Sequence, residues 1–197
     1  MSKSINQFRT SIKEINDLKA TLDNLSPLLT VAIDLSDFYR SLIVQAVSAF
    51  DFFVHEFVIE EMIEIYKGNR LSTPHFNDYT IPISSTIGTI PSESFIQAHI
   101  RKKHSWLSFQ DPDKVADVLR LISIKKVWEE VAPTFSLNAG DLKTKLKLVV
   151  DRRNKIAHES DMNPSYPGTK WPISPSDVKD IIDFLDVLIN DIYSKLK

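Results

Sequence analysis

Residues 36–68 constrain the fold more than any other part of the chain, because they have the pattern of one long buried helix. Ser36 and Asp37 are favoured N-cap residues, and Gly68 is a plausible C-cap. An unbroken helix of this length spans about 48 Å at the standard rise. Between residues 42 and 54 it is apolar on nearly every side, which is typical of the central helix of a bundle. The sequence therefore predicts an all-α fold with this helix at its core.

One thin polar stripe interrupts the apolar surface of this helix. Its residues recur at steps of three and four and are Ser41, Gln45, Ser48, Asp51 and His55. Two interpretations remain open. The stripe faces water, or it faces the helix that carries Arg153 and His158 and forms the floor of a cleft.

An apolar stripe over residues 5–25 predicts an N-terminal helix, which Pro27 ends. The near-heptad spacing suits packing against a second helix, in the same chain or in a partner. We therefore divide the chain into an N-terminal helical arm, residues 1–30, and a helical domain, residues 31–197. The stripe consists of Ile5, Phe8, Ile12, Ile15, Leu18, Leu22 and Leu25.

Residues 69–95 hold several turn formers, and we expect a long irregular insertion between helices there. Helical patterns resume at 93–106, 112–122 and 123–132, and Asp111 and Pro112 open the second of them as N-cap and N1 residues.

The helix that follows starts at Asn138 or Gly140 and ends near His158. A proline-rich loop, residues 161–175, is long enough to fold back over this helix end, and Ser174–Asp177 opens the last helix. The predicted buried face of the first of these two helices is Leu142, Leu146, Val149 and Val150.

The composition is that of an ordinary soluble globular protein, with 43% apolar residues, 25% charged residues and a formal net charge of −2. Because cysteine is absent, neither a disulfide nor a thiolate metal site can form. The N-terminus has no apolar leader, and the apolar segment 42–58 is too short and too polar to cross a bilayer. We expect a cytoplasmic protein with no membrane partner. The histidines at 75, 99 and 104 lack convergent partners, so we expect no metal and no cofactor.

The segment Arg152–Glu159 sets an arginine, an amide and a histidine close enough to act together. Asn154 and His158 are four residues apart, so they share one face of a helix. A neutral imidazole exchanges protons near pH 7, and the guanidinium of Arg153 can neutralise a phosphate through its planar fork. Such a set would suit a metal-free ribonuclease. The competing interpretation is that these residues only offset the dipole and the free carbonyls at a helix end.

The order Arg153, Asn154, three residues and His158, closing a helix in a small all-helical protein, resembles the signature of the HEPN superfamily. The wider context resembles its bacterial RiboL-PSP-HEPN branch over residues 36–195. That context comprises the helix-like segment 48–56 before the motif helix, and His158–Asp161 and the segment 164–173 after it.

The resemblance implies a HEPN-like helical bundle that acts as a homodimeric endoribonuclease. It would cut RNA to a 2′,3′-cyclic phosphate in a cleft shared by two motif helices. It also implies a toxin or effector in bacterial defence against phage, controlled by an antitoxin or another defence-system protein.

Carried over residue by residue, the resemblance makes His158 the proton-transfer group, Arg153 the phosphate clamp, and Asn154 the residue that orients His158 or the scissile phosphate. Asp51, if buried, needs a counterion, and we expect Arg153 or Arg152 to supply it. The residues expected to support these three are Asp51, His55, Arg152 and Glu159.

A different class of function remains open. In a non-catalytic HEPN adaptor or RNA-binding module, Asn154 and His158 would cap the helix, and the stripe at 5–25 would recruit a partner protein. The acidic net charge favours this alternative. An antitoxin-like HEPN subunit associated with a nucleotidyltransferase is a third possibility, and it differs mainly in needing a partner from its operon.

Overall fold

The computed structural model describes residues 2–30 and 33–197, and this part of the chain is helical. It contains no β-strand and one isolated bridge, between Met162 and Lys170. The predicted all-α fold is confirmed. The α-helices are α1 (Lys3–Leu25), α2 (Ser36–Tyr66), α3 (Pro74–Asn77), α4 (Glu93–His104), α5 (Pro112–Leu119), α6 (Val127–Val131), α7 (Ala139–Glu159) and α8 (Pro175–Leu196), and the 3-10 helices are η1 (Ser26–Leu28), η2 (Ile83–Thr86) and η3 (Ala132–Phe135).

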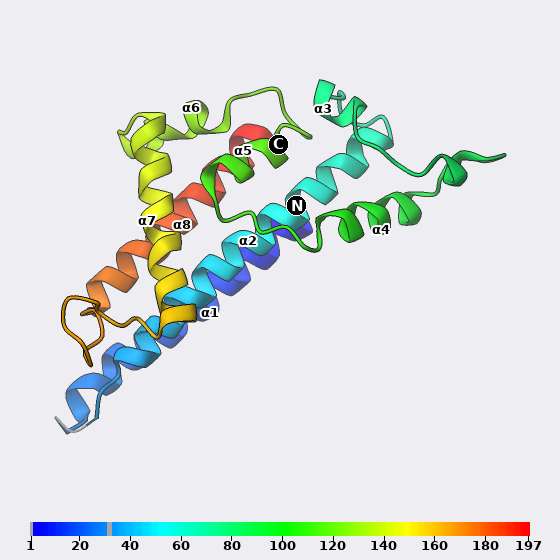
Figure 1. Ribbon diagram of the computed structural model, residues 1–197. Helices are drawn as coiled ribbons and strands as arrows, with labels where there is room; N and C mark the ends of the chain where they lie inside the picture. Colours follow the sequence, from blue (N-terminus) through cyan, green and yellow to red (C-terminus); the bar gives the residue numbers. More distant parts are fainter. Residues whose placement is uncertain (1, 31–32) are drawn as a thin grey trace.

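Helix α2 is the centre of the bundle, as the sequence predicted. It packs against α1, α8, α7 and α4, and it runs the length of the molecule in Figure 1. The helix begins at Ser36 as predicted, but its N-cap residue is Leu35, and the Asp34 carboxylate accepts a hydrogen bond from the Ser36 backbone N–H at 2.8 Å. Gly68 ends the helix with φ +79°, and its N–H donates to the carbonyl of Ile65 at 2.9 Å.

The expectation that the apolar segment is too short to cross a membrane is wrong. It belongs to a helix of 31 residues whose most apolar stretch has a mean hydropathy of 1.7, which suffices by length and composition. Just over half of that stretch, 56%, is buried inside the molecule. Phe50, Phe53 and Phe57 are fully buried among the other helices, as expected of the core helix of a bundle.

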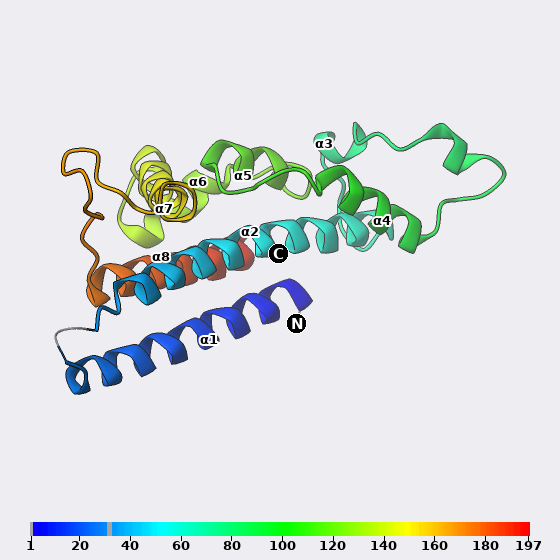
Figure 2. The ribbon, with the colours of Figure 1, turned by 60° about the horizontal axis from the view of Figure 1, so that its bottom comes forward.

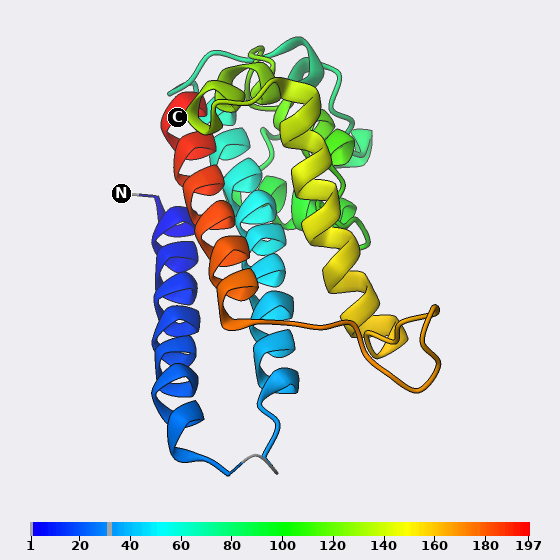
Figure 3. The ribbon, with the colours of Figure 1, turned by 90° about the vertical axis from the view of Figure 1, so that its left-hand side faces the viewer.

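Helices α1, α2 and α8 lie side by side and pack against one another (Figure 3), and α7 packs on α2 at an angle to it (Figure 1). The helix predicted as an arm packs within its own chain, because α1 lies along α2 and α8. Its predicted stripe is buried in part: Leu18 and Leu25 stay 41% and 40% exposed, whereas the buried members are Ile5, Phe8, Ile12, Ile15 and Leu22.

Residues 67–92 connect α2 to α4 with little regular structure, as predicted, and contain only the short α3 and η2. Figure 2 shows this segment extending away from the bundle at the end opposite the 160–174 loop. The insertion therefore lies far from the C-terminal end of α7.

Helix α7 has the boundaries and the buried face that the sequence predicted. The Asn138 side chain caps it by accepting from the Asp141 N–H at 2.9 Å. Its buried residues are Leu142, Leu146, Val149 and Val150, and it packs against α2 and α6. This packing fixes the C-terminal end of α7 over the first half of α2.

Candidate functional site

The C-terminal end of α7 is closed by two consecutive residues in the left-handed region. Ser160 has φ 52° and Asp161 has φ 58°, a conformation that costs most residues other than glycine about 1–2 kcal/mol. The Asp161 N–H donates to the Lys155 carbonyl at 2.9 Å. The chain therefore turns sharply just after His158, and the 160–174 loop runs back toward α2.

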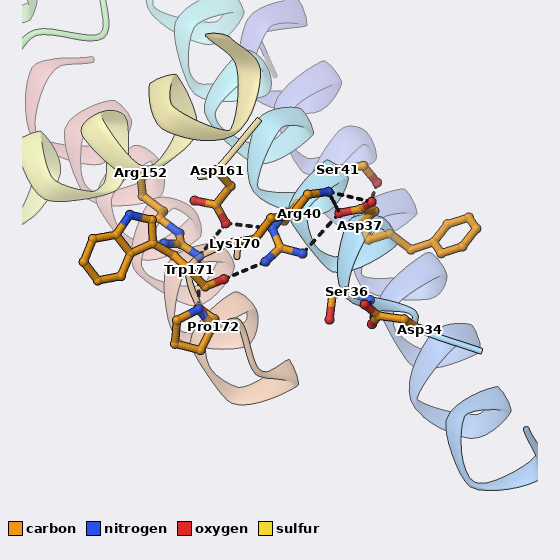
Figure 4. A network of polar contacts seen from close by, with 11 residues as sticks. Asp34, Ser36, Asp37, Arg40, Ser41, Arg152, Asp161, Lys170, Trp171 and Pro172 are labelled. Atoms are coloured by element: carbon orange, nitrogen blue, oxygen red, sulfur yellow. Dashed lines mark hydrogen bonds and ion pairs between the residues drawn. The ribbon is translucent and has the colours of Figure 1, made fainter. Parts of the chain in front are cut away.

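A buried ion-pair network holds this turn in place (Figure 4). The Asp161 side chain is completely buried, and its Oδ2 accepts from Arg40 Nε at 2.7 Å and from Arg152 Nη2 at 2.8 Å. Arg40 Nη2 also donates to the Trp171 carbonyl at 2.6 Å, and Arg152 Nη2 to the Pro172 carbonyl at 3.0 Å. Three segments, α2, α7 and the loop, are thereby joined at one carboxylate.

Arg152 is therefore paired with Asp161. The expectation that Arg153 or Arg152 is the counterion of Asp51 is wrong. Asp51 Oδ1 instead accepts from the backbone N–H of Phe109 at 2.6 Å, and Gln110 Nε2 is 3.5 Å from its other oxygen. The reason is geometric, because residues 105–111 pass beside α2 and offer a backbone donor that no helical periodicity could predict. Arg40 and Asp161 were not predicted either, since neither belongs to a periodic pattern.

Arg153 and Asn154 are brought together. Arg153 Nη1 donates to Asn154 Oδ1 at 3.1 Å, and among the described residues the buried Arg153 Nε has no hydrogen-bond partner. Both line a hollow of about 280 Å³ between α7 and the start of α5, together with Lys114 and Lys147.

Arg153 also borders a second hollow of about 360 Å³, on its α2 side, which contains Ser48, Asp51 and His55. Farther along α2, Ser41 and Gln45 line a third hollow with Ile156 and Ala157. The polar stripe therefore faces space shared with α7, which supports the second interpretation from the sequence.

His158 lies in the last turn of α7 with an exposed side chain, outside the lining of these three hollows. Glu159, the last residue of the helix, is exposed as well. Lys155 points toward the loop, with its Nζ 5.5 Å from the centre of the Trp171 ring. His158 thus lies outside the two hollows that Arg153 lines.

His55 and His104 belong to an aromatic cluster beside this site. The His55 ring is 4.4 Å from the Phe109 ring, and its Nε2 is 4.0 Å from Asp51 Oδ1. Burial lowers the pKa of His104 to about 4, with smaller effects of the charges on His55 and Lys103. In the described part of the chain, no group of three or more His, Asp or Glu side chains is placed to hold a metal ion.

The model of the RiboL-PSP-HEPN family matches residues 6–197, nearly the whole chain. No curated protein and no solved structure matches the chain.

Proposed function

Because the chain belongs to the RiboL-PSP-HEPN family, whose members are predicted ribonucleases, we propose that it is a metal-independent endoribonuclease acting through Arg153, Asn154 and His158. A HEPN domain implies RNA as the substrate. The observation that carries the proposal is the Arg153–Asn154 pair, which borders one open hollow, with Arg153 also bordering a second, one helical turn before an exposed histidine.

Metal-free cleavage of RNA needs a base for the 2′-hydroxyl proton, positive charge on the phosphorane, and an acid for the leaving 5′-oxygen. In this proposal Arg153 supplies the charge and His158 transfers a proton. Asn154 orients the guanidinium, to which it is already hydrogen-bonded. The product would end in a 2′,3′-cyclic phosphate, because the 2′-oxygen is the nucleophile.

A second acid–base group would come from a second copy of the chain. A two-fold interface places the same patch of both subunits face to face. The exposed His158 of each subunit would then turn toward a cleft that the other subunit completes. The proposal therefore includes a homodimer, in the cytoplasm, acting as a toxin or effector in bacterial defence under the control of a partner protein. The motif resemblance is the support for that biological role.

Substitution of the motif distinguishes an enzyme from an adaptor. We expect Arg153→Ala and His158→Ala each to lower the cleavage rate of a mixed RNA pool at least 100-fold, the lower range for loss of a positioned acid, base or charge. Truncation opens no closed cavity, because His158 is exposed and Arg153 borders two hollows, so the stability cost should be about 1 kcal/mol or less.

Lys155→Ala is the control on the same helix turn, and it should cleave at the wild-type rate. If both motif variants instead unfold the protein while Lys155→Ala does not, the motif is structural and the adaptor becomes the better hypothesis.

A further inference from the structure

We propose that the hollow between α2 and residues 101–110, called here the base pocket, binds one unpaired base of the RNA. This inference rests on the proposed function and adds a specificity site to it. Asp51, Phe52, Gln110 and Arg153 are among the residues that line it. The volume of about 360 Å³ falls within the range of small-ligand pockets, roughly 300–1,000 Å³.

Position makes the base pocket part of the same substrate path. Arg153 and Gln110 line both the base pocket and the hollow beside Asn154, so the two spaces adjoin. A phosphate neutralised by Arg153 would leave the attached nucleotide free to turn its base toward α2. Proteins that recognise single-stranded RNA bind bases in this splayed-out state.

Phe52 supplies an apolar surface against which a base can stack. Its side chain is 49% exposed, whereas the neighbouring phenylalanines at 50 and 53 are fully buried. Stacking of a base on an aromatic ring contributes roughly 1–3 kcal/mol and tolerates any base. An exposed ring at the edge of a polar hollow therefore fits a nucleobase better than it fits a phosphate.

Asp51 supplies discrimination among bases. Its carboxylate is fixed in place by the Phe109 N–H at 2.6 Å, and among the described residues its second oxygen has only the distant Gln110 amide at 3.5 Å. Arg101 and Glu56, which also line the pocket, neutralise each other's charge, since Arg101 Nη2 donates to Glu56 Oε2 at 2.5 Å. A fixed acceptor attracts the amino groups of adenine, cytosine and guanine. Uracil offers one N–H between two carbonyl oxygens, which the carboxylate repels, so the pocket should disfavour it.

Binding to a cleavage-deficient protein tests the base pocket without relying on turnover. With His158→Ala as the background, we expect oligo(A) and oligo(C) to bind at least tenfold more tightly than oligo(U). Adding Asp51→Asn should reduce this ratio to about twofold or less, because an amide presents a donor as well as an acceptor. The asparagine Oδ1 can still accept from Phe109, so the fold is retained, which far-ultraviolet circular dichroism checks.

Phe52→Ala and Phe38→Ala form a matched pair, since both side chains lie on α2 and are about half exposed, at 49% and 55%. Phe52→Ala should weaken the binding of all three oligonucleotides about tenfold, and Phe38→Ala should change none. The base pocket is overturned if Asp51→Asn leaves the ratio unchanged, or if Phe52→Ala acts by splitting an oligomer. If these binding results hold but wild-type protein cuts no RNA, the proposed nuclease fails and the base pocket stands.

Discussion

His104 shows how a single residue can make the stability of this protein depend on pH. Its side chain is buried, and its Nδ1 has no hydrogen-bond partner among the described residues. Its ring packs edge-to-face against the rings of Tyr79 and Phe109. Burial lowers its pKa from 6.5 to about 4. The unfolded chain therefore binds a proton between these two values that the folded chain does not, and the free energy of unfolding falls as the pH is lowered.

We expect the urea midpoint of wild-type protein to drop between pH 6.5 and pH 4, and this drop to be smaller in His104→Phe. Phenylalanine keeps the aromatic packing and removes the titration. His75→Phe, at an exposed position, should show the full wild-type dependence. Equal drops in all three proteins would contradict the buried neutral state of His104.

The residues of the motif could be found in the sequence because their relation is local. Asn154 and His158 share a helix face through a fixed spacing, and Arg153 is adjacent. The partners of Asp51 and Arg152 could not be found, because they lie in loops at residues 109 and 161. A helical period carries no information about which loop atom reaches a side chain.

At the scale of secondary-structure elements, the Arg40–Asp161–Arg152 network joins the first turns of α2 to the end of α7. Asp161→Asn should lower the free energy of unfolding by about 3–5 kcal/mol, since it leaves the buried Arg40 without its main counterion. Asp37→Asn is the control on the same arginine. Asp37 is largely exposed, and its loss should cost less than about 1 kcal/mol.

Urea unfolding of both variants at pH 7 measures the difference. Equal costs for the two substitutions would show that the buried pair contributes nothing beyond a surface ion pair.

The long helices could be predicted because each carries one sustained pattern. α1, α2, α7 and α8 have broad apolar surfaces, and Asn138, Ser174 and Asp111 cap their helices as the sequence indicated. The short elements fit less well, because predicted helices over 112–122 and 123–132 are reduced to Pro112–Leu119 and Val127–Val131. Eight and five residues carry little periodicity, and tertiary packing decides where such helices end.

At the scale of the whole molecule, a single subunit leaves His158 outside the hollows that Arg153 borders. The proposed mechanism therefore needs a second subunit. The chain has a mass of 22.5 kDa. We expect light scattering at micromolar concentration to give twice that mass. A monomer at this concentration that still cuts RNA would contradict the two-subunit site.

The arrangement of α1 illustrates what the sequence left open at this scale. Its heptad-like stripe fitted a partner helix in the same chain or in another, and only the structure places it against α2 and α8. Apolar spacing identifies a buried face, but it does not identify the surface that covers it.

The most direct test of the central claim is the chemistry of the RNA ends produced with EDTA present. Mass spectrometry of fragments made by wild-type protein should find 2′,3′-cyclic phosphates, and His158→Ala should produce no fragments above the buffer background. Fragments ending in a 3′-hydroxyl, or cleavage that requires added magnesium or manganese, would contradict the account and direct attention to Asp51, Glu56 and Glu159.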